Sequence, residues 1–208
     1  RFATKEFTGE IIPKEDMEMI AETARLSPSS FGLEPWKFLI VENKELIKEI
    51  SEVSWGFQRQ ASTTSHIVIA LTKAGSEVKY DSDYIRNLWI NTKGVSEEFF
   101  EGIKDVLKNF QVGKLEADET NEKLLEWSKR QTYIALGNMM TAAAMREIDS
   151  CAIEGFDKEK VEEILAKKGL LDKEKYELTY LIAFGYRKED PNRKKSRLPK
   201  SEVIQWVE

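Results

Sequence analysis

The stretch IALGNMMTAAAM, residues 134–145, does most to decide the fold, because its apolar and small side chains leave almost no polar face. With the charged residues before it, this stretch predicts one long helix over 121–148 whose second half is buried. Its glycine and alanines also permit a neighbouring helix to approach closely. A helix buried on all sides needs other layers around it, which the rest of the chain should supply.

Short runs of strand-forming residues lie on both sides of this helix in the sequence. The segment 77–110 is charged and interrupted by glycines, which predicts helices joined by a loop that form a mobile cover. The tail 198–208 carries apolar residues beyond the last core element, which predicts an arm that covers another surface. Strands separated by helices, with few hairpin signals, indicate an α+β or α/β class with a sheet packed between helices. The predicted strands are 36–41, 66–71, 151–153 and 178–186, and the other predicted helices are 13–26, with Pro13 in the first turn, 44–53 and 157–167.

The composition is that of a globular protein, and we expect a single domain over 1–208. The chain has 208 residues, of which 41% are hydrophobic and 33% charged, and a domain of this size buries roughly 70% of its unfolded surface. No stretch approaches the roughly 18 apolar residues that span a bilayer, so no membrane partner is expected. A net charge of −5 gives no general attraction for nucleic acid. Cys151 is the only cysteine, which excludes an internal disulfide and fits a reducing cytoplasm.

The sequence offers few residues for acid–base or metal chemistry. His66 is the only histidine, so we predict no metal site. Because His66 begins a predicted strand and has no nucleophile near it in sequence, we interpret it as a hydrogen-bonded structural residue. No glycine-rich phosphate-binding fingerprint occurs. If the chain is an enzyme, an organic cofactor should therefore supply the reactivity.

Two basic segments have the composition of a phosphate clamp. The first is Arg1-Phe2-Ala3-Thr4-Lys5, and the second is Lys195-Ser196-Arg197. In an extended segment Lys195 and Arg197 point the same way, so a phosphate between them would accept charge-assisted hydrogen bonds. Either segment alone is better interpreted as a solvated basic surface, since most charged side chains are exposed.

Other motifs accompany these segments in a fixed order along the chain. They are Ser27-Pro28-Ser29-Ser30, then Pro35-Trp36, and then Ile153-Glu154-Gly155-Phe156. The whole set resembles the FMN-dependent nitroreductase family over nearly all of the chain. This resemblance implies an α+β, nitroreductase-like three-layer fold, in which a central mixed sheet is flanked by helices. It also implies a long buried helix, an extended C-terminal arm on a neighbouring subunit, and a homodimer with two flavins at the interface.

The resemblance also assigns roles to individual residues. It implies that Arg1, Lys195 and Arg197 meet at the FMN phosphate. Lys5 is implied to face the N1 and C2 carbonyl edge of the flavin, where an ammonium would favour the reduced anion. Gly155, after Glu154, is implied to offer its backbone N–H to flavin N5, and a glycine lets this backbone approach a planar ligand without a clash. An ordinary strand-to-helix turn is the other interpretation of this glycine. The full set of implied cofactor-binding residues is Arg1, Phe2, Ala3, Lys5, Pro28, Ser29, Ser30, Gln60, Ile153, Glu154, Gly155, Lys195 and Arg197, with Lys5, Glu154 and Gly155 as the catalytic residues.

Three aromatic residues are expected to bind the substrate. Phe31 follows the Pro-Ser-Ser loop, and Phe99 and Phe100 match a pair of aromatics that in relatives flank the open face of the flavin. Packing within a helical core is the other interpretation of Phe99 and Phe100. Two positions depart from the family pattern, because Ala3 stands where a serine is frequent and Phe57 where an asparagine is frequent.

The sequence therefore predicts an oxidoreductase that passes hydride from NADH or NADPH through flavin N5 to a small-molecule acceptor, such as a nitroaromatic or a quinone, by a ping-pong mechanism. Flavin or pteridine reduction and reductive dehalogenation on the same scaffold remain alternatives. Two further alternatives are a flavin-binding protein without turnover and a helical interaction module whose basic termini bind an acidic partner.

Overall fold

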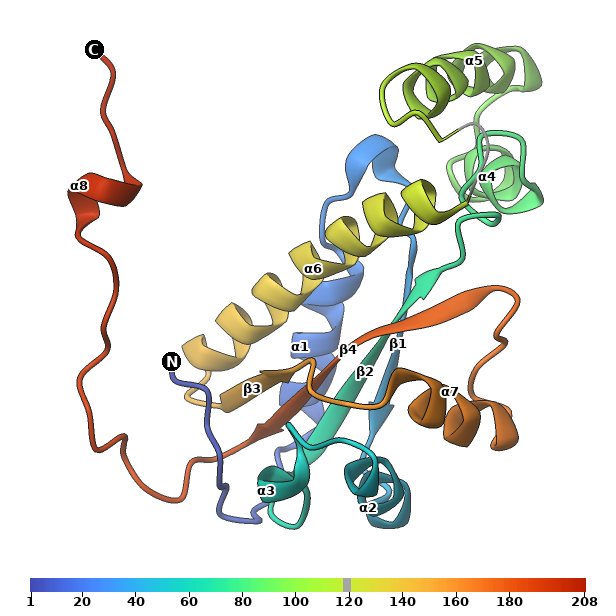
Figure 1. Cartoon of the computed structure of the whole chain (residues 1–208). Coiled ribbons are helices and arrows are strands. Elements are labelled where there is room, and N and C mark those ends of the chain that lie inside the picture. Colours follow the sequence, from blue (N-terminus) through green and yellow to red (C-terminus); the bar gives the residue numbers. More distant parts are fainter. Residues whose placement is uncertain (118–120) are drawn as a thin grey trace.

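The computed structural model describes residues 1–117 and 121–208. In these residues a sheet has helices on both faces and is followed by an extended C-terminal arm (Figure 1). The strands are β1 (Trp36–Val41), β2 (His66–Lys73), β3 (Asp149–Ile153) and β4 (Tyr176–Gly185). The helices are α1 (Lys14–Arg25), α2 (Lys44–Glu52), α3 (Gln58–Ala61), α4 (Asp83–Asn87), α5 (Glu97–Gly113), α6 (Glu122–Met145), α7 (Lys158–Lys167) and α8 (Lys200–Val203), with a 3₁₀ turn η1 (Ser30–Gly32) and a π-helical turn η2 (Leu88–Thr92).

The sheet has the order β1-β2-β4-β3, and each neighbouring pair of these strands is antiparallel. The prediction of a mixed sheet is therefore wrong for the described strands. In Figure 1 the chain continues past the end of β3 into α7 and then comes back along β4, so this connection produces an antiparallel pair instead of a crossover. A parallel bridge between Ala3 and Ser150 lies at the free edge of β3, outside the named pairs.

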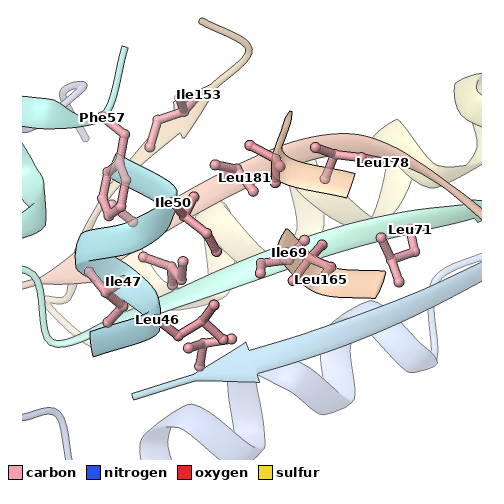
Figure 2. Close-up of a cluster of buried hydrophobic side chains, with 14 of the residues drawn as sticks. Leu46, Ile47, Ile50, Phe57, Ile69, Leu71, Ile153, Leu165, Leu178 and Leu181 are labelled. Atoms are coloured by element: carbon pink, nitrogen blue, oxygen red, sulfur yellow. The ribbon is translucent and has the colours of Figure 1, made fainter. Parts of the chain in front are cut away.

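Helices cover both faces of the sheet, which confirms the three-layer prediction. One apolar cluster joins α1 and α6 to one face, and a second joins α2 and α7 to the other. Figure 2 shows the second cluster, where side chains from α2 and α7, such as Ile50 and Leu165, lie against Ile69 and Leu181 of the sheet. Strand β2 lies between both layers and is buried along its whole length, which explains its continuous apolar sequence.

The second half of helix α6 was predicted to be buried, and within one chain only its inner face is. Its inner face packs on α1 and the sheet, whereas Ile134, Gly137 and Asn138 are exposed and Met145 keeps 82% of its surface in contact with solvent. The small side chains on both faces made the two faces indistinguishable in sequence. The other helices agree with the predictions to within a residue or two, except that Pro13 immediately precedes α1 instead of lying in its first turn.

The predicted cover and the predicted arm both form distinct parts of the chain. Elements α4, η2 and α5 enclose an apolar cluster of their own that includes Leu33, Phe100 and Trp127. The arm leaves the body after β4, and its apolar residues are exposed, with Trp206 at 80% (Figure 1). Among the helices that the structure describes, none has the length and apolar character needed to cross a membrane.

Candidate functional site

The two basic segments of the sequence come together in space. Arg1, Lys195 and Arg197 line one small hollow of about 150 Å³ together with Arg193. Within residues 1–117 and 121–208, none of these four cations forms an ion pair with a carboxylate. Four cations without a counter-charge repel one another, so the hollow favours a bound anion such as a phosphate.

A buried carboxylate anchors the backbone beside this hollow. Asp149 at the start of β3 accepts hydrogen bonds from the backbone N–H and from Nε of Arg187, both at 3.1 Å, and from Thr4 Oγ1 at 3.4 Å. The bond from Arg187 to Asp149 raises the pKa of the arginine side chain. Asp149 thus fixes the N-terminal segment, β3 and the start of the arm relative to one another.

Lys5 and Gln60, which were predicted from separate motifs, meet at a single buried atom. Lys5 Nζ lies 3.4 Å and Gln60 Nε2 lies 3.5 Å from Sγ of Cys151 in β3. Gln60 is itself buried, so its side chain is held from inside the protein. Phe57, which stands where relatives often carry an asparagine, is a core residue with no exposed surface.

The backbone of Gly155 is held tightly on one side and is unpaired on the other. Its carbonyl accepts a hydrogen bond of 2.7 Å from the N–H of Gly56. Its own N–H donates no hydrogen bond within the part of the chain that the structure describes. Because Gly155 is only partly buried, this N–H is open to water or to a ligand. Ile153, two residues earlier, points its side chain into the core, so only its backbone could contact a cofactor.

The reason for a glycine at position 155 differs from the predicted one. A Cβ added to Gly155 would lie 2.7 Å from Trp55 Nε1 and 3.1 Å from the backbone N and Cα of Gly56. The side chain of Trp55 and the backbone of Gly56 therefore leave little room for a Cβ at this position, with or without a ligand. Trp55 itself is 68% exposed, so a large indole lies beside this peptide at the surface.

The side chain of Glu154 is held by a residue that sequence reasoning did not identify. The hydroxyl of Tyr133 in α6 donates a hydrogen bond to Glu154 Oε1. Burial, followed by this hydrogen bond, raises the pKa of the tyrosine. Both residues line a hollow of about 410 Å³ that also contains Lys129, Arg130 and Lys158.

The Pro-Ser-Ser loop also contacts α6, at Gln131. The N–H of Ser30 donates to Oε1 of Gln131 at 2.9 Å, and Ser29 Oγ accepts from the N–H of Glu34 at 2.9 Å. The clamp residue Arg1, by contrast, contacts Met140 Sδ at 2.9 Å. These two contact points are nine residues apart along α6, which corresponds to about 14 Å. One copy of the chain thus does not bring Pro28, Ser29 and Ser30 to the cation cluster.

The three aromatic residues assigned to substrate differ in their surroundings. Phe31 has a positive φ of 56° and packs against Phe110 and Trp127, with ring centroids 5.0 Å and 6.5 Å away. Phe100 is buried in the cover, and the guanidinium of Arg86 lies 5.6 Å from its ring. Packing is therefore the better interpretation of Phe100, whereas Phe99 is 55% exposed beside a surface hollow.

Several residues of the site were missed from the sequence. Arg193 belongs to the same basic run as Lys195, so the run of charges could have identified it. Tyr133 bonds to Glu154, which is 21 positions away in the sequence, and Gln131 bonds to Ser30, which is 101 positions away. No local sequence pattern indicates contacts of this kind. His66, in contrast, is confirmed as a structural residue, because its Nδ1 lies 2.7 Å from Ser65 Oγ and burial lowers its pKa.

The fold and this site define a class of three-layer α+β proteins with a cationic cleft beside the edge strand β3. The sequence profile of the Nitroreductase family matches residues 1–186, and the chain belongs to that family. A Bacillus subtilis protein named "Putative NAD(P)H nitroreductase YfkO" is 43% identical over 208 residues, which cover 100% of this chain and 94% of that protein.

Solved structures share the fold. The nitroreductase-like protein ydfN of Bacillus subtilis has a TM-score of 0.79 at 21% identity, covering 100% of this chain and 95% of that one. A protein of Exiguobacterium sibiricum, solved in complex with FMN, has a TM-score of 0.74 at 21% identity, covering 100% of this chain and 93% of that one.

Proposed function

We propose that this protein is an FMN-dependent oxidoreductase that transfers hydride from NADH or NADPH to a small-molecule acceptor. The observation that carries the proposal is the hollow lined by Arg1, Arg193, Lys195 and Arg197, which have no carboxylate partner among the described residues. A phosphate monoester would supply the missing negative charge. The names of the relatives and the FMN bound to the Exiguobacterium protein support the same assignment.

The residues present also fit the rest of a flavin. Gly155 offers a backbone N–H that has no partner among the described residues, which suits the N5 edge. Lys5, anchored at Cys151, suits the edge where negative charge accumulates on reduction. Bound FMN would supply the hydride-accepting chemistry, and the chain would supply position and charge. Nitroaromatics and quinones are the proposed acceptors. We also propose that residues 1–208 form a single domain and that the protein is located in the cytoplasm.

We further propose that the active unit is a homodimer with each flavin at the interface. Within one copy, the hollow lined by the cation cluster includes none of Pro28, Ser29 and Ser30, so in this arrangement the loop comes from the second copy. The exposed outer face of α6 gives such a copy an apolar surface to cover. The exposed arm can reach the free edge of β1, where Ile11 and Ile40 border a hollow of about 340 Å³.

Mixing two defective variants tests this arrangement. Arg197→Ala removes a clamp residue, and Gln131→Ala removes the anchor of the Ser30 loop, so each variant alone should bind FMN poorly. If one site combines the clamp of one copy with the loop of the other, each mixed dimer has one intact site, and random exchange restores about a quarter of all sites. No recovery, with exchange of copies verified by a mass-tagged chain, would place each site within a single copy.

The cofactor and the reductive reaction are tested by anaerobic absorbance spectra of the purified protein, recorded before and after addition of NADH or NADPH. A flavin band that bleaches supports the proposed oxidoreductase. A band that persists would indicate a flavin-binding protein without turnover. No flavin band, even after FMN is supplied, would contradict the proposal altogether.

A further inference from the structure

The bond between Tyr133 and Glu154 links two elements that meet at the proposed flavin site. Tyr133 lies on α6, and Glu154 directly follows β3. The ring of Tyr133 packs against the ring of Tyr180 with centroids 5.1 Å apart, and the Tyr180 hydroxyl donates to the carbonyl of Thr132 at 2.8 Å. The Tyr133 hydroxyl is therefore presented from a fixed ring and not from a mobile surface side chain.

The same peptide is held from its other side by backbone hydrogen bonds. The N–H of Gly56 donates to the Gly155 carbonyl at 2.7 Å, and the N–H of Phe156 donates to the Glu154 carbonyl at 3.0 Å. These bonds leave the Glu154 side chain as the remaining point at which the peptide can be anchored to α6. Tyr133 occupies that point, while the Gly155 N–H stays unpaired.

Alternative partners for the Glu154 carboxylate lie in the same hollow. Lys158 already pairs with Glu162 at 3.6 Å and with Glu177, but Arg130 has no ion pair among the residues described. A carboxylate released from the tyrosine would be attracted to such a guanidinium. The hydroxyl therefore decides where the carboxylate lies and, through it, how the following peptide is oriented.

We propose that Tyr133 is a positioning residue for the flavin: by holding Glu154, it fixes the Gly155 N–H that faces N5. This inference rests on the proposed function. A backbone N–H donates more strongly to the imine-type N5 of oxidised FMN than to N5 of reduced FMN, which carries its own hydrogen. Loss of the Tyr133 hydroxyl should therefore weaken the binding of oxidised FMN more than that of reduced FMN. The midpoint potential of the bound flavin should then become more positive.

The test compares Tyr133→Phe with a control, Tyr176→Phe, which removes another phenol hydroxyl, at the start of β4, without touching Tyr133 or Glu154. Apoprotein is titrated with FMN by flavin fluorescence, and the midpoint potential of the holoprotein is measured against a reference dye. Tyr133→Phe should weaken oxidised FMN binding by about fivefold, because the neutral hydrogen bond from the Gly155 N–H to N5 is no longer held in place. It should also shift the potential in the positive direction. Tyr176→Phe should leave both flavin measurements unchanged.

Substitutions at Glu154 separate positioning from simple packing. Glu154→Gln keeps an oxygen that accepts from Tyr133, so it should weaken oxidised FMN binding less than Glu154→Ala, which should resemble Tyr133→Phe. The double variant Tyr133→Phe, Glu154→Ala should be no worse than either single variant, because both remove the same bond. Additive losses, or a Tyr133→Phe variant with wild-type affinity and potential, would overturn the inference. A wild-type protein that binds no FMN would instead overturn the proposed function and this inference with it.

Discussion

Replacing Gly155 with alanine tests the argument that two backbone segments pass one another in contact. The added Cβ would lie 2.7 Å from Trp55 Nε1, and the exposed indole can turn away at little cost. It would also lie 3.1 Å from the backbone N and Cα of Gly56, which are tied to residue 155 by a hydrogen bond of 2.7 Å. The backbone must therefore move by a few tenths of an ångström. Overpacking of this kind typically costs about 1–3 kcal/mol.

The assay is thermal unfolding of the apoprotein, so that the result does not depend on any cofactor. For a chain of this size a loss of 1–3 kcal/mol lowers the melting temperature by about 2–12 °C. Gly102→Ala in α5 is the matched control, because a Cβ there meets nothing within 4 Å and alanine favours a helix. The double variant Trp55→Ala, Gly155→Ala should recover only the part of the loss that the indole causes. A Gly155→Ala protein as stable as the control would refute the close-contact argument.

Three further predictions concern other parts of the molecule. Arg197→Ala should weaken FMN binding by about 1.5–3 kcal/mol, as expected when a hydrogen bond to a charged group is lost, and an unchanged fluorescence titration would remove this residue from the clamp. Burial lowers the pKa of His66 from its ordinary value of 6.5, so the unfolded chain takes up a proton first as the pH falls. Stability should therefore be fully present above pH 6.5 and decline below it, and urea unfolding of His66→Gln should show a flatter pH dependence; equal slopes would contradict this. Tyr84 donates to the carbonyls of residues 33 and 34, which lie in the strained 31–34 turn, at 2.7 and 3.0 Å. Tyr84→Phe should cost about 0.5–1.5 kcal/mol of stability and raise the KM for the acceptor, and a variant with an unchanged KM would separate this turn from substrate binding.

The layers of the fold were predictable because each depends on a local pattern. The apolar run of β2 indicates burial on both faces. The helical spacing of Leu46, Ile47 and Ile50 indicates a helix with one apolar face. Strand direction was not predictable in this way. It depends on whether α7 returns the chain across the sheet or carries it onward, and no residue in that helix encodes the difference.

The candidate site shows the same division between local and distant signals. Lys195 and Arg197 were identifiable because two cations two residues apart share one side of an extended segment. The contact of Tyr133 with Glu154 depends on how α6 lies across the end of β3, and a tyrosine in a helix has many other uses. Sequence reasoning could therefore locate the proposed phosphate clamp, but not the tyrosine that bonds to Glu154.

Gly155 shows how the structure adds a second reason for a glycine that the sequence had singled out. The sequence suggested a glycine that clears space for a ligand, yet the nearest atoms to its absent Cβ belong to Trp55 and Gly56. Gly56 is constrained in return, since a Cβ there would lie 3.1 Å from the Gly155 carbonyl oxygen. The two glycines let the chain segments on either side approach closely enough to share a hydrogen bond. That contact directs one carbonyl inward and leaves the neighbouring N–H unpaired for a ligand, so the packing requirement and the proposed binding role arise from the same close approach.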